Sequence, residues 1–594
     1  MSGTSSSLNE SKSESQIDSA WNVQHQHHST DSSSTMPDII EVRSASTSSL
    51  SPSLQIGKLV IMGPALKTFV AGAGFMSDAY DLFVIDVVKN VMSELYPQSV
   101  AEAAAVSTAA LVGAVMGQLV FGALADKLGR RIIFMVTLVL VVIGSLGSAT
   151  CYGGGAVNIY DQLAIWRFIL GFGVGGEYPL SATITSEGAA AASRGYAIAL
   201  VFSMQGVGKI LAASINALCL SGGMPLDSAW RFALAFGSVP GLLTVYWRWQ
   251  IEESHHFKAV VDADNKTSTS SSIESMKQGQ EERENPLKQV NQLEQQQQQS
   301  EPNHSVSAVR FIDSLLPPSS DPPPILSIPG LPESLQTKTS SFRKTLLTIY
   351  EFRYVLLGTA GTWFLLDITF YGQGLFSGTV LSIAGISGGG SSGPKTNKQL
   401  LDLALGSLML VCIAMPGYIV GTLTIERIGR RNMQLMGFSI CAILFLILGA
   451  DYTTIRNNKA LFVLLYGLTF FFSNFGANLT TFVIPAEAFP TRARATCHGI
   501  SAASGKLGAV LGSSGMAPLL KIYGDDAASK DKGLQLVMYI CFAVSLLGLF
   551  WTILLTKETG KMSLETLDNR EVITKKTNTS EELERQRKML LQGS

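Results

Sequence analysis

Long apolar stretches alternate with polar segments along this chain. The apolar stretches recur from Leu59 to about residue 249 and again from about residue 352 to 556, and each approaches or exceeds the roughly 20 residues that cross a bilayer. They lack the alternation over about ten residues that marks a membrane β-strand, so we expect helices in contact with a lipid bilayer. The pattern predicts an all-α membrane protein with twelve transmembrane helices, near residues 60–88, 101–125, 132–151, 160–185, 195–219, 229–249, 352–384, 401–425, 432–450, 460–486, 498–520 and 535–556.

The polar segments divide the chain into five predicted parts. Residues 1–57 are Ser-rich and lack the basic region and short apolar core of a signal peptide, so we expect a disordered cytoplasmic tail. Residues 250–345 contain runs of Gln and Pro and are expected to form a disordered cytoplasmic linker. Six-helix bundles are predicted at 58–249 and 346–558, and a cytoplasmic tail at 559–594. The linker and tails are candidate contact sites for cytoplasmic regulators.

Composition excludes several other classes of protein. Only 15% of the 594 residues are charged, which argues against an ordinary soluble enzyme. The 44 Lys and Arg residues nearly balance the 45 Asp and Glu residues, so nucleic acid is not an expected partner. The six cysteines stand singly, without the spacing of a metal site or a disulfide scaffold. We therefore expect no enzyme activity, no metal and no cofactor.

Basic residues indicate how the helices are oriented. Lys and Arg gather in alternate connections, for example around Lys127, Arg194 and Arg427, and are fewer in the connections between them. Connections rich in Lys and Arg usually lie on the cytoplasmic side. Both termini and the linker are therefore expected inside the cell, and the plasma membrane is the expected location.

A repeated motif relates the two halves. Asp126–Arg131 has the sequence DKLGRR, and Glu426–Arg431, offset by 300 residues, has the sequence ERIGRR. Internal repeats of helices around a central site are typical of secondary transporters, so two pseudo-symmetric bundles are predicted. A charge pair at these positions could hold one conformational state. The predicted conformational latch comprises Asp126, Arg130, Arg131, Glu426, Arg430 and Arg431.

Ionisable residues also occur deep inside predicted spans. Such groups are costly in a membrane and are functional candidates by default. The deepest are Asp78, Asp81, Glu177, Asp367 and Lys506, and they come from both halves of the chain. They are accompanied by polar and aromatic residues that would otherwise be assigned to helix packing.

Five motifs resemble those of a known family. They are Gly171–Glu187 (GFGVGGEYPLSATITSE), Asp78–Phe83 (DAYDLF), Trp363–Tyr371 (WFLLDITFY), Phe489–Arg494 (FPTRAR) and His498–Lys506 (HGISAASGK). With them the chain resembles the phosphate:proton symporter family of the major facilitator superfamily, which includes fungal and plant high-affinity phosphate transporters. The resemblance covers about residues 58–250 and 345–570. It implies import of inorganic phosphate with protons through alternating access of a site between the two bundles.

The resemblance also implies roles for individual residues. It assigns Asp78, Glu177 and Asp367 to proton coupling, although the family usually has Asp at the position of Glu177. An ionised Asp367 could accept a hydrogen bond from a P–OH group, which fully ionised sulfate lacks. The residues that it places around phosphate are Tyr178, Gln205, Trp363, Asp367, Tyr371, Asn478 and Lys506.

The sequence leaves two alternative functions open. A carrier of sugar or of another anion is one, because the phrase Lys557–Glu565 (KETGKMSLE) occurs in similar form in sugar porters. The buried Lys506 and the scarcity of amide pairs for reading hydroxyls argue against sugar. The other alternative is a phosphate sensor that uses the same fold and signals through its linker and tails.

Overall fold

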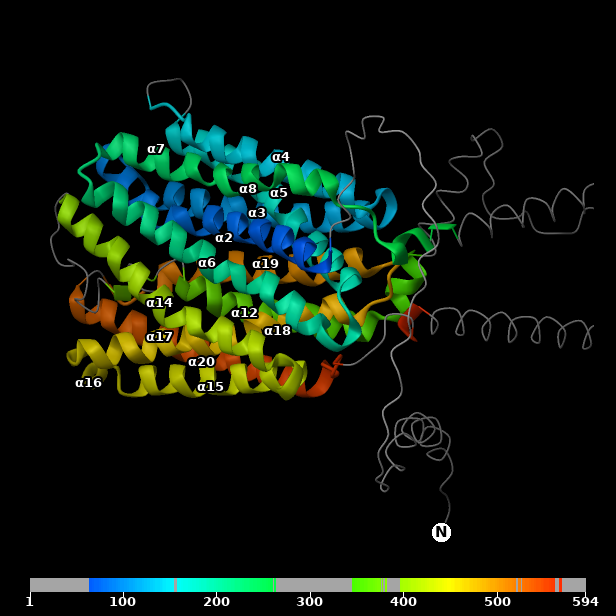
Figure 1. Ribbon diagram of the computed structural model, residues 1–594. Helices are drawn as coiled ribbons and strands as arrows, with labels where there is room; N and C mark the ends of the chain where they lie inside the picture. Colours follow the sequence, from blue (N-terminus) through cyan, green and yellow to red (C-terminus); the bar gives the residue numbers. More distant parts are fainter. Residues whose placement is uncertain are drawn as a thin grey trace, which may run out of the picture. The chain divides into compact units, whose positions relative to one another are not determined.

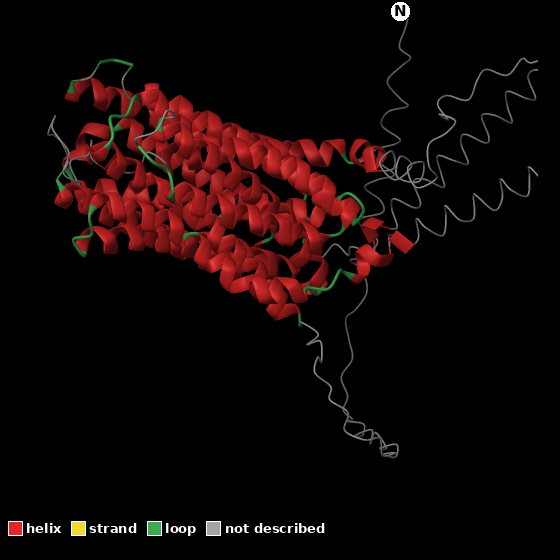
Figure 2. Cartoon of the chain, turned by 90° about the horizontal axis from the view of Figure 1, so that it is seen from above, coloured by secondary structure: helices red, strands yellow, loops and turns green. Residues whose placement is uncertain are grey.

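The computed structural model describes residues 63–153, 158–259, 261–262, 345–374, 377, 380–381, 396–519, 522–524, 526–560 and 566–568. The predicted tail 1–57 lies outside these residues, as do most of the predicted linker 250–345 and most of the tail 559–594. Over the described ranges the secondary structure is helical, without strands (Figure 2). The prediction of an all-α protein is confirmed.

The first half of the chain forms one bundle. Its helices come in close succession, and α6 follows a short 3₁₀ turn at Ala191–Ser193. The helices are α2 (Pro64–Leu95), α3 (Val100–Leu128), α4 (Arg130–Ala149), α5 (Ile159–Gly188), α6 (Arg194–Ser221), α7 (Leu226–Phe236) and α8 (Ser238–Gln250).

The second half forms the other bundle (Figure 1). The two bundles meet most extensively along two helix pairs, α3 with α19 and α6 with α14. The second bundle contains α12 (Arg353–Gly374), α14 (Asn397–Ile428), α15 (Arg430–Ala450), α16 (Tyr452–Asn457), α17 (Lys459–Phe475), α18 (Ala477–Ala488), α19 (Arg494–Leu519) and α20 (Ala527–Leu555).

Two of the predicted spans are broken by glycine. The span predicted at 229–249 divides into α7 and α8 at Gly237, where a Cβ would lie 1.8 Å from Oδ1 of Asp81. The span predicted at 460–486 divides into α17 and α18 at Gly476, which packs against the backbone of Gly437. With each broken pair taken as one span and the short α16 left out, the described helices give twelve successive spans, six in each bundle.

Nine spans of the described chain are both long and apolar enough to cross a membrane by themselves. The other three are α5, α19 and the broken pair α7–α8. The members of the broken pair are short, with 11 and 13 residues. Helices α5 and α19 carry the buried charges of Glu177 and Lys506, and the site below uses both.

The starts and ends of the helices repeat between the bundles. Ser99 and Thr396 each begin a helix with a capping box, in which the side chain of the cap and that of the third helical residue satisfy each other's backbone amides. Gly129 and Gly429 end α3 and α14 with φ angles of 96° and 88°, a conformation that favours glycine. The tight turn lets α4 and α15 start one residue later, at Arg130 and Arg430.

Candidate functional site

A buried ion pair lies at the centre of the candidate site. Lys506 of α19 donates from Nζ to Oδ2 of Asp367 on α12 at 3.0 Å, and both side chains are almost completely buried. The ring of Tyr371 lies 4.5 Å from the ammonium nitrogen, and the ring of Tyr178 lies 5.0 Å from it. Because Tyr178 belongs to α5 of the other bundle, the cation sits where the two bundles meet.

Hydroxyl and amide groups extend this site toward α6 and α14. The hydroxyl of Tyr418 donates to Oε1 of Gln205 at 2.6 Å, and Nδ2 of Asn478 donates to the same oxygen at 3.2 Å. Gln205 in turn donates from Nε2 to the hydroxyl of Tyr178 at 3.5 Å. Asn474 accepts from Asn478 at 2.9 Å. Helices of both bundles therefore contribute to one hydrogen-bonded cluster.

Trp363 completes the set of predicted substrate residues. Its ring lies edge-on to those of His498 and Phe482, with the His498 ring centroid at 5.6 Å, and 6.4 Å from the ring of Tyr178. Gly505 makes this position possible, because a Cβ there would lie 2.3 Å from Cδ1 of Trp363. The structure thus brings all seven predicted substrate residues into one connected cluster.

Two of the three acids assigned to proton coupling lie inside the first bundle. Glu177 accepts hydrogen bonds from Arg248 at 2.5 Å and from Thr137 at 2.9 Å. Asp78 is buried, and its Oδ2 has no hydrogen-bond partner among the described residues. Gly74 leaves room for the ion pair, since a Cβ there would lie 2.2 Å from Arg248 and 2.8 Å from Glu177. The third acid, Asp367, lies in the central pair.

Asp81 belongs to a separate buried contact. Ser145 donates to its Oδ1 at 3.0 Å, and Arg167 donates to its main-chain oxygen at 2.5 Å. These bonds join α2, α4 and α5 near the break at Gly237. Asp81 therefore helps to hold the first bundle together.

The predicted latch residues lie together at one end of the bundles, called here the latch end. Asp126 of α3 accepts hydrogen bonds from the backbone amide of Thr496 at 2.8 Å and from its hydroxyl at 2.7 Å. Glu426 of α14 accepts one from the backbone amide of Tyr196 at 3.0 Å. Thr496 and Tyr196 lie in the first turns of α19 and α6, so each acid caps a helix of the opposite bundle. Carboxylates are favoured at helix N-termini, where backbone amides are otherwise unpaired.

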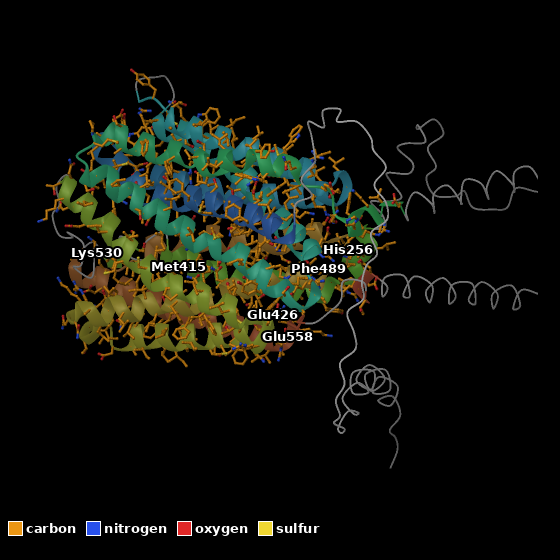
Figure 3. The ribbon with its side chains drawn as sticks, viewed as in Figure 1. His256, Met415, Glu426, Phe489, Lys530 and Glu558 are labelled. Atoms are coloured by element: carbon orange, nitrogen blue, oxygen red, sulfur yellow. The ribbon has the colours of Figure 1, made fainter. Side chains whose placement is uncertain are left out.

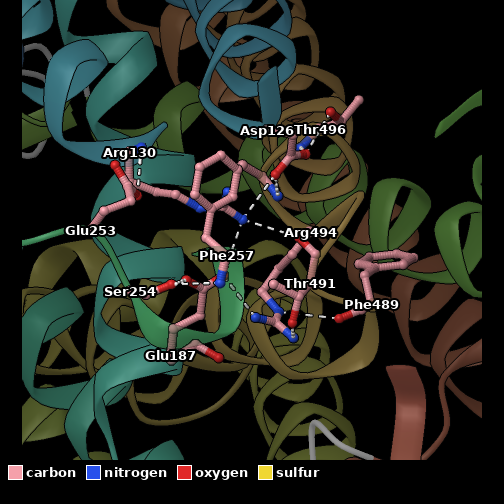
Figure 4. A network of polar contacts seen from close by, with 12 residues as sticks. Asp126, Arg130, Glu187, Glu253, Ser254, Phe257, Phe489, Thr491, Arg494 and Thr496 are labelled. Carbon is pink, nitrogen blue, oxygen red and sulfur yellow. Dashed lines mark hydrogen bonds and ion pairs between the residues drawn. The ribbon is translucent and has the colours of Figure 1, made fainter. Parts of the chain in front are cut away.

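Buried arginines also join the two bundles at the latch end (Figure 4). Arg130 donates to Glu187 at 3.1 Å, to Asp126 at 3.2 Å and to the main-chain oxygen of Thr491 at 3.0 Å. Arg494 of the second bundle donates to the same oxygen of Glu187 at 3.1 Å. Glu187 therefore pairs with one arginine from each bundle. In the other half Arg430 pairs with Glu426 at 2.7 Å and with Glu487 at 2.9 Å.

The second arginine of each repeated motif has a different position. Arg131 donates to the main-chain oxygen of Trp249 at 2.7 Å, and Arg431 donates to those of Thr556 and Ile553. Both therefore bind helix ends within their own bundles, and these hydrogen bonds do not join them to the opposite bundle. They differ in this from Asp126, Arg130 and Glu426, which bond to the opposite bundle. The hydrogen bonds of Arg430 to Glu426 and Glu487 also stay within its own bundle.

Sequence reasoning missed several residues of these networks. Arg248 stands at the end of its predicted span, where basic residues usually mark orientation, whereas it is the partner of Glu177. Glu253 and Glu558 follow α8 and α20, and each accepts hydrogen bonds from two backbone amides at the start of α4 or α15. Glu558 lies within Lys557–Glu565, the phrase that resembles sugar porters. That resemblance was the signal in the sequence that could have identified Glu558. Tyr418 stood alone in an apolar stretch and gave none.

Comparison with known proteins places the chain in a family. The family model described as "Sugar (and other) transporter" matches residues 66–314 and 392–570. The chain belongs to this family. Sugar (and other) transporter proteins move solutes across membranes, so the expectation that the chain is not an enzyme is confirmed.

Two relatives of the chain are named as inorganic phosphate transporters. The chain is 36% identical over 535 residues to "Low affinity inorganic phosphate transporter 1" of Petunia hybrida, covering 84% of this chain and 91% of that protein. It is 35% identical over 528 residues to "Inorganic phosphate transporter 1-11" of Oryza sativa subsp. japonica, covering 84% of this chain and 86% of that protein.

Among solved structures, the major facilitator superfamily proton:xylose symporter XylE bound to 6-bromo-6-deoxy-D-glucose matches with a TM-score of 0.59. The match has 19% sequence identity and covers 85% of this chain and 98% of that chain. It shows that the two chains share the major facilitator fold, which was the predicted fold.

Proposed function

We propose that this transporter imports inorganic phosphate together with protons, by alternating access of the site around Lys506. The buried pair of Lys506 and Asp367 at the interface between the bundles carries the proposal. Lys506 supplies a compact positive charge, and the nearby tyrosine and amide groups offer hydrogen bonds to phosphate oxygens. The names of the relatives in Petunia and rice support phosphate as the substrate.

Asp367 has a defined role in this proposal. Phosphate at neutral pH carries protons, so a phosphate held by Lys506 can donate a P–OH hydrogen bond to the carboxylate of Asp367. Sulfate has no proton to donate and would be repelled by the same carboxylate. Selectivity would then come from an unfavourable contact with the wrong anion as well as from favourable contacts with phosphate.

Proton movement is proposed to involve Asp78 and Glu177. The two acids lie close enough to interact electrostatically. Asp78 also interacts electrostatically with Arg248, the ion-pair partner of Glu177. Tyr178 follows Glu177 directly on α5, so the acid side chain and a residue of the phosphate cluster share one turn of helix. A proton taken up by Asp78 or Glu177 changes the attraction between Glu177 and Arg248. The first bundle thereby has a means of responding to protonation.

The latch end is proposed to face the cytoplasm of a cell whose plasma membrane holds the transporter. The basic connections near Lys127 and Arg427 support this orientation. In this arrangement the contacts of Asp126, Glu187 and Glu426 close the inner side of the site. Their release would open the site to the cytoplasm.

Uptake of [³²P]phosphate by reconstituted vesicles tests the proposal. Vesicles with a more acidic exterior should accumulate phosphate above the external concentration, and a sodium gradient should not replace the proton gradient. Lys506→Ala, reconstituted in equal amount and in the same orientation, should show no more uptake than protein-free vesicles. Labelled xylose and sulfate serve as substrate controls. Uptake of xylose but not phosphate, or phosphate accumulation driven by sodium alone, would refute the proposal.

A further inference from the structure

A second buried lysine lies between the bundles and has no assigned role. Lys209 belongs to α6 and is one helical turn beyond Gln205, so the two side chains share a face of the helix. Its ammonium nitrogen lies 3.9 Å from the ring centroid of Phe83 and 4.0 Å from that of Phe370. Lys209 is 9% exposed, and among the described residues it has neither a hydrogen bond nor an ion pair.

Lys209 borders a pocket of about 60 Å³. Asn216 from α6 and Ser407 from α14 are among the other polar side chains that line this pocket. The hydroxyl of Ser407 is buried and has no hydrogen-bond partner among the described residues. The volume has room for several water molecules or one small oxyanion. The pocket is lined mainly by apolar groups, and the cation and the hydroxyl, which have no hydrogen-bond partner among the described residues, suit it to an anionic ligand.

The pocket lies on the side of the central site away from the latch. On α6 the chain runs from Arg194 at the latch end through Gln205 to Lys209. On α14 it runs in the opposite sense, from Ser407 through the central part of the helix to the latch end. In Figure 3 Met415 of α14 lies between Glu426 at the latch end and Lys530 at the opposite end. An anion arriving from the opposite end would meet Lys209 before it met Lys506.

The charges around the pocket leave it positive. Asp367 interacts electrostatically with both Lys506 and Lys209, so two lysines share one acid. The acid in the pocket lining, Asp86, is 3.5 Å from Lys89 and accepts a hydrogen bond from Ser377, which also lines the pocket. A buried cation without a hydrogen-bond partner is costly, and the two aromatic faces offset this cost only in part. An anion that accepts hydrogen bonds from Lys209 would complete its environment.

We propose that Lys209, with Ser407 and Asn216, forms an outer binding site for a small oxyanion, in which phosphate is held before it moves to Lys506. The inference rests on the proposed phosphate transport and adds a site to it. Phe83 and Phe370 hold the ammonium in place without neutralising it. One turn of α6 separates the outer site from Gln205, so the anion passes from one lysine to the other over a short distance.

Kinetics of phosphate uptake test the outer site. Lys209→Met should raise the KM for [³²P]phosphate by about tenfold or more, the usual effect of losing a hydrogen bond from a charged group. The maximal rate at saturating phosphate should stay within about twofold of the parent, because Lys506 and Asp367 are retained. Lys209→Arg should keep a KM near that of the parent. Lys398→Met, which removes an exposed lysine at the same end of α14, is the matched control and should leave both values unchanged.

Chemical rescue separates a role of the charge from a role in packing. Lys209→Cys is prepared in a Cys412→Ser background, because Cys412 is the exposed one of the six cysteines. Attachment of an aminoethyl group to the introduced thiol through a disulfide restores a cation and should lower the KM again. Attachment of a neutral methylthio group to the same thiol should not.

The outcomes distinguish this inference from the proposed function. Lys209→Met with the KM of the parent would overturn the outer site, whether or not its maximal rate falls. The outer site would also be overturned if Lys209→Met loses uptake, Lys209→Arg loses it too, and aminoethylation of Lys209→Cys does not restore it. A parent protein that takes up no phosphate would refute phosphate transport itself.

Discussion

The strongest stability prediction concerns the buried pair of Lys506 and Asp367. Lys506→Met removes the ammonium but keeps most of the apolar stem, and it leaves the carboxylate of Asp367 buried without its 3.0 Å partner. Both side chains are at most 2% exposed, so water cannot replace the lost contact. Removing one member of such a pair typically costs about 3–5 kcal/mol. The double variant with Asp367→Asn removes both charges and should recover most of that loss.

Thermal unfolding of the purified transporter in detergent measures this effect. The parent and the double variant should unfold at similar temperatures, and Lys506→Met should unfold at a clearly lower one. Arg456→Met, which breaks a partly exposed pair with Asp531, is the control and should cost no more than about 1 kcal/mol. Added phosphate should stabilise the parent more than the double variant, because the double variant has lost the charge of Lys506 at the central site.

The same experiment can refute the reasoning. If Lys506→Met is as stable as the parent, the pair does not hold two desolvated charges. If the loss of stability in the double variant equals the sum of the losses in Lys506→Met and Asp367→Asn alone, the two residues act independently. Stabilisation of the double variant by phosphate to the same extent as the parent would remove Lys506 and Asp367 from the substrate site.

Four other predictions follow from the site. Glu177→Gln should impair accumulation against a gradient more than exchange of phosphate for phosphate, while Glu177→Asp should remain active; equal loss of both modes would indicate a structural role. Asp367→Asn should weaken inhibition of uptake by unlabelled phosphate and arsenate and strengthen inhibition by sulfate, and an unchanged phosphate-to-sulfate ratio would contradict the P–OH contact. Asp126→Asn should weaken closure of the latch end and make a cysteine placed in the site more accessible to a reagent from that side; unchanged labelling would argue against a latch. Gly505→Ala should lower phosphate uptake by displacing Trp363, whereas Gly515→Ala, where a Cβ meets no atom within 4 Å, should not; equal uptake by both would show that Trp363 tolerates movement.

Most of the fold could be predicted because bilayer-length apolar stretches are an unusually direct signal. The breaks between α7 and α8 and between α17 and α18 were not predicted, although the first has a local signal in Gly237–Gly241 (GSVPG) and the second in Gly476. What a local pattern does not contain is the neighbour that each glycine contacts. A Cβ at Gly237 would meet Asp81, which is 156 residues earlier in the chain, and one at Gly476 would meet Gly437.

The candidate site could be predicted where a charge stood at membrane depth or a motif resembled a known family. Lys506 and Asp367 are conspicuous in apolar surroundings, and the structure places them in contact. Tyr418 and Asn474 were missed because a single tyrosine or asparagine in an apolar helix is usually a packing residue. Lys209 was missed although it is a lysine inside a predicted span, because it lies outside the motifs that resemble the family.

The exchange of helix caps between the bundles has a consequence for how the proposed latch tolerates change over evolution. Asp126 and Glu426 bind backbone amides at the start of α19 and α6, and such amides are present whatever side chain occupies those positions, proline excepted. Residues 196 and 496 can therefore vary without loss of the amide contacts, while the two acids cannot. Since the two caps act in parallel, weakening of one leaves the other in place. If the caps act as the proposed latch, lineages can adjust how readily it opens by changing one repeat at a time, without passing through a form that fails to close.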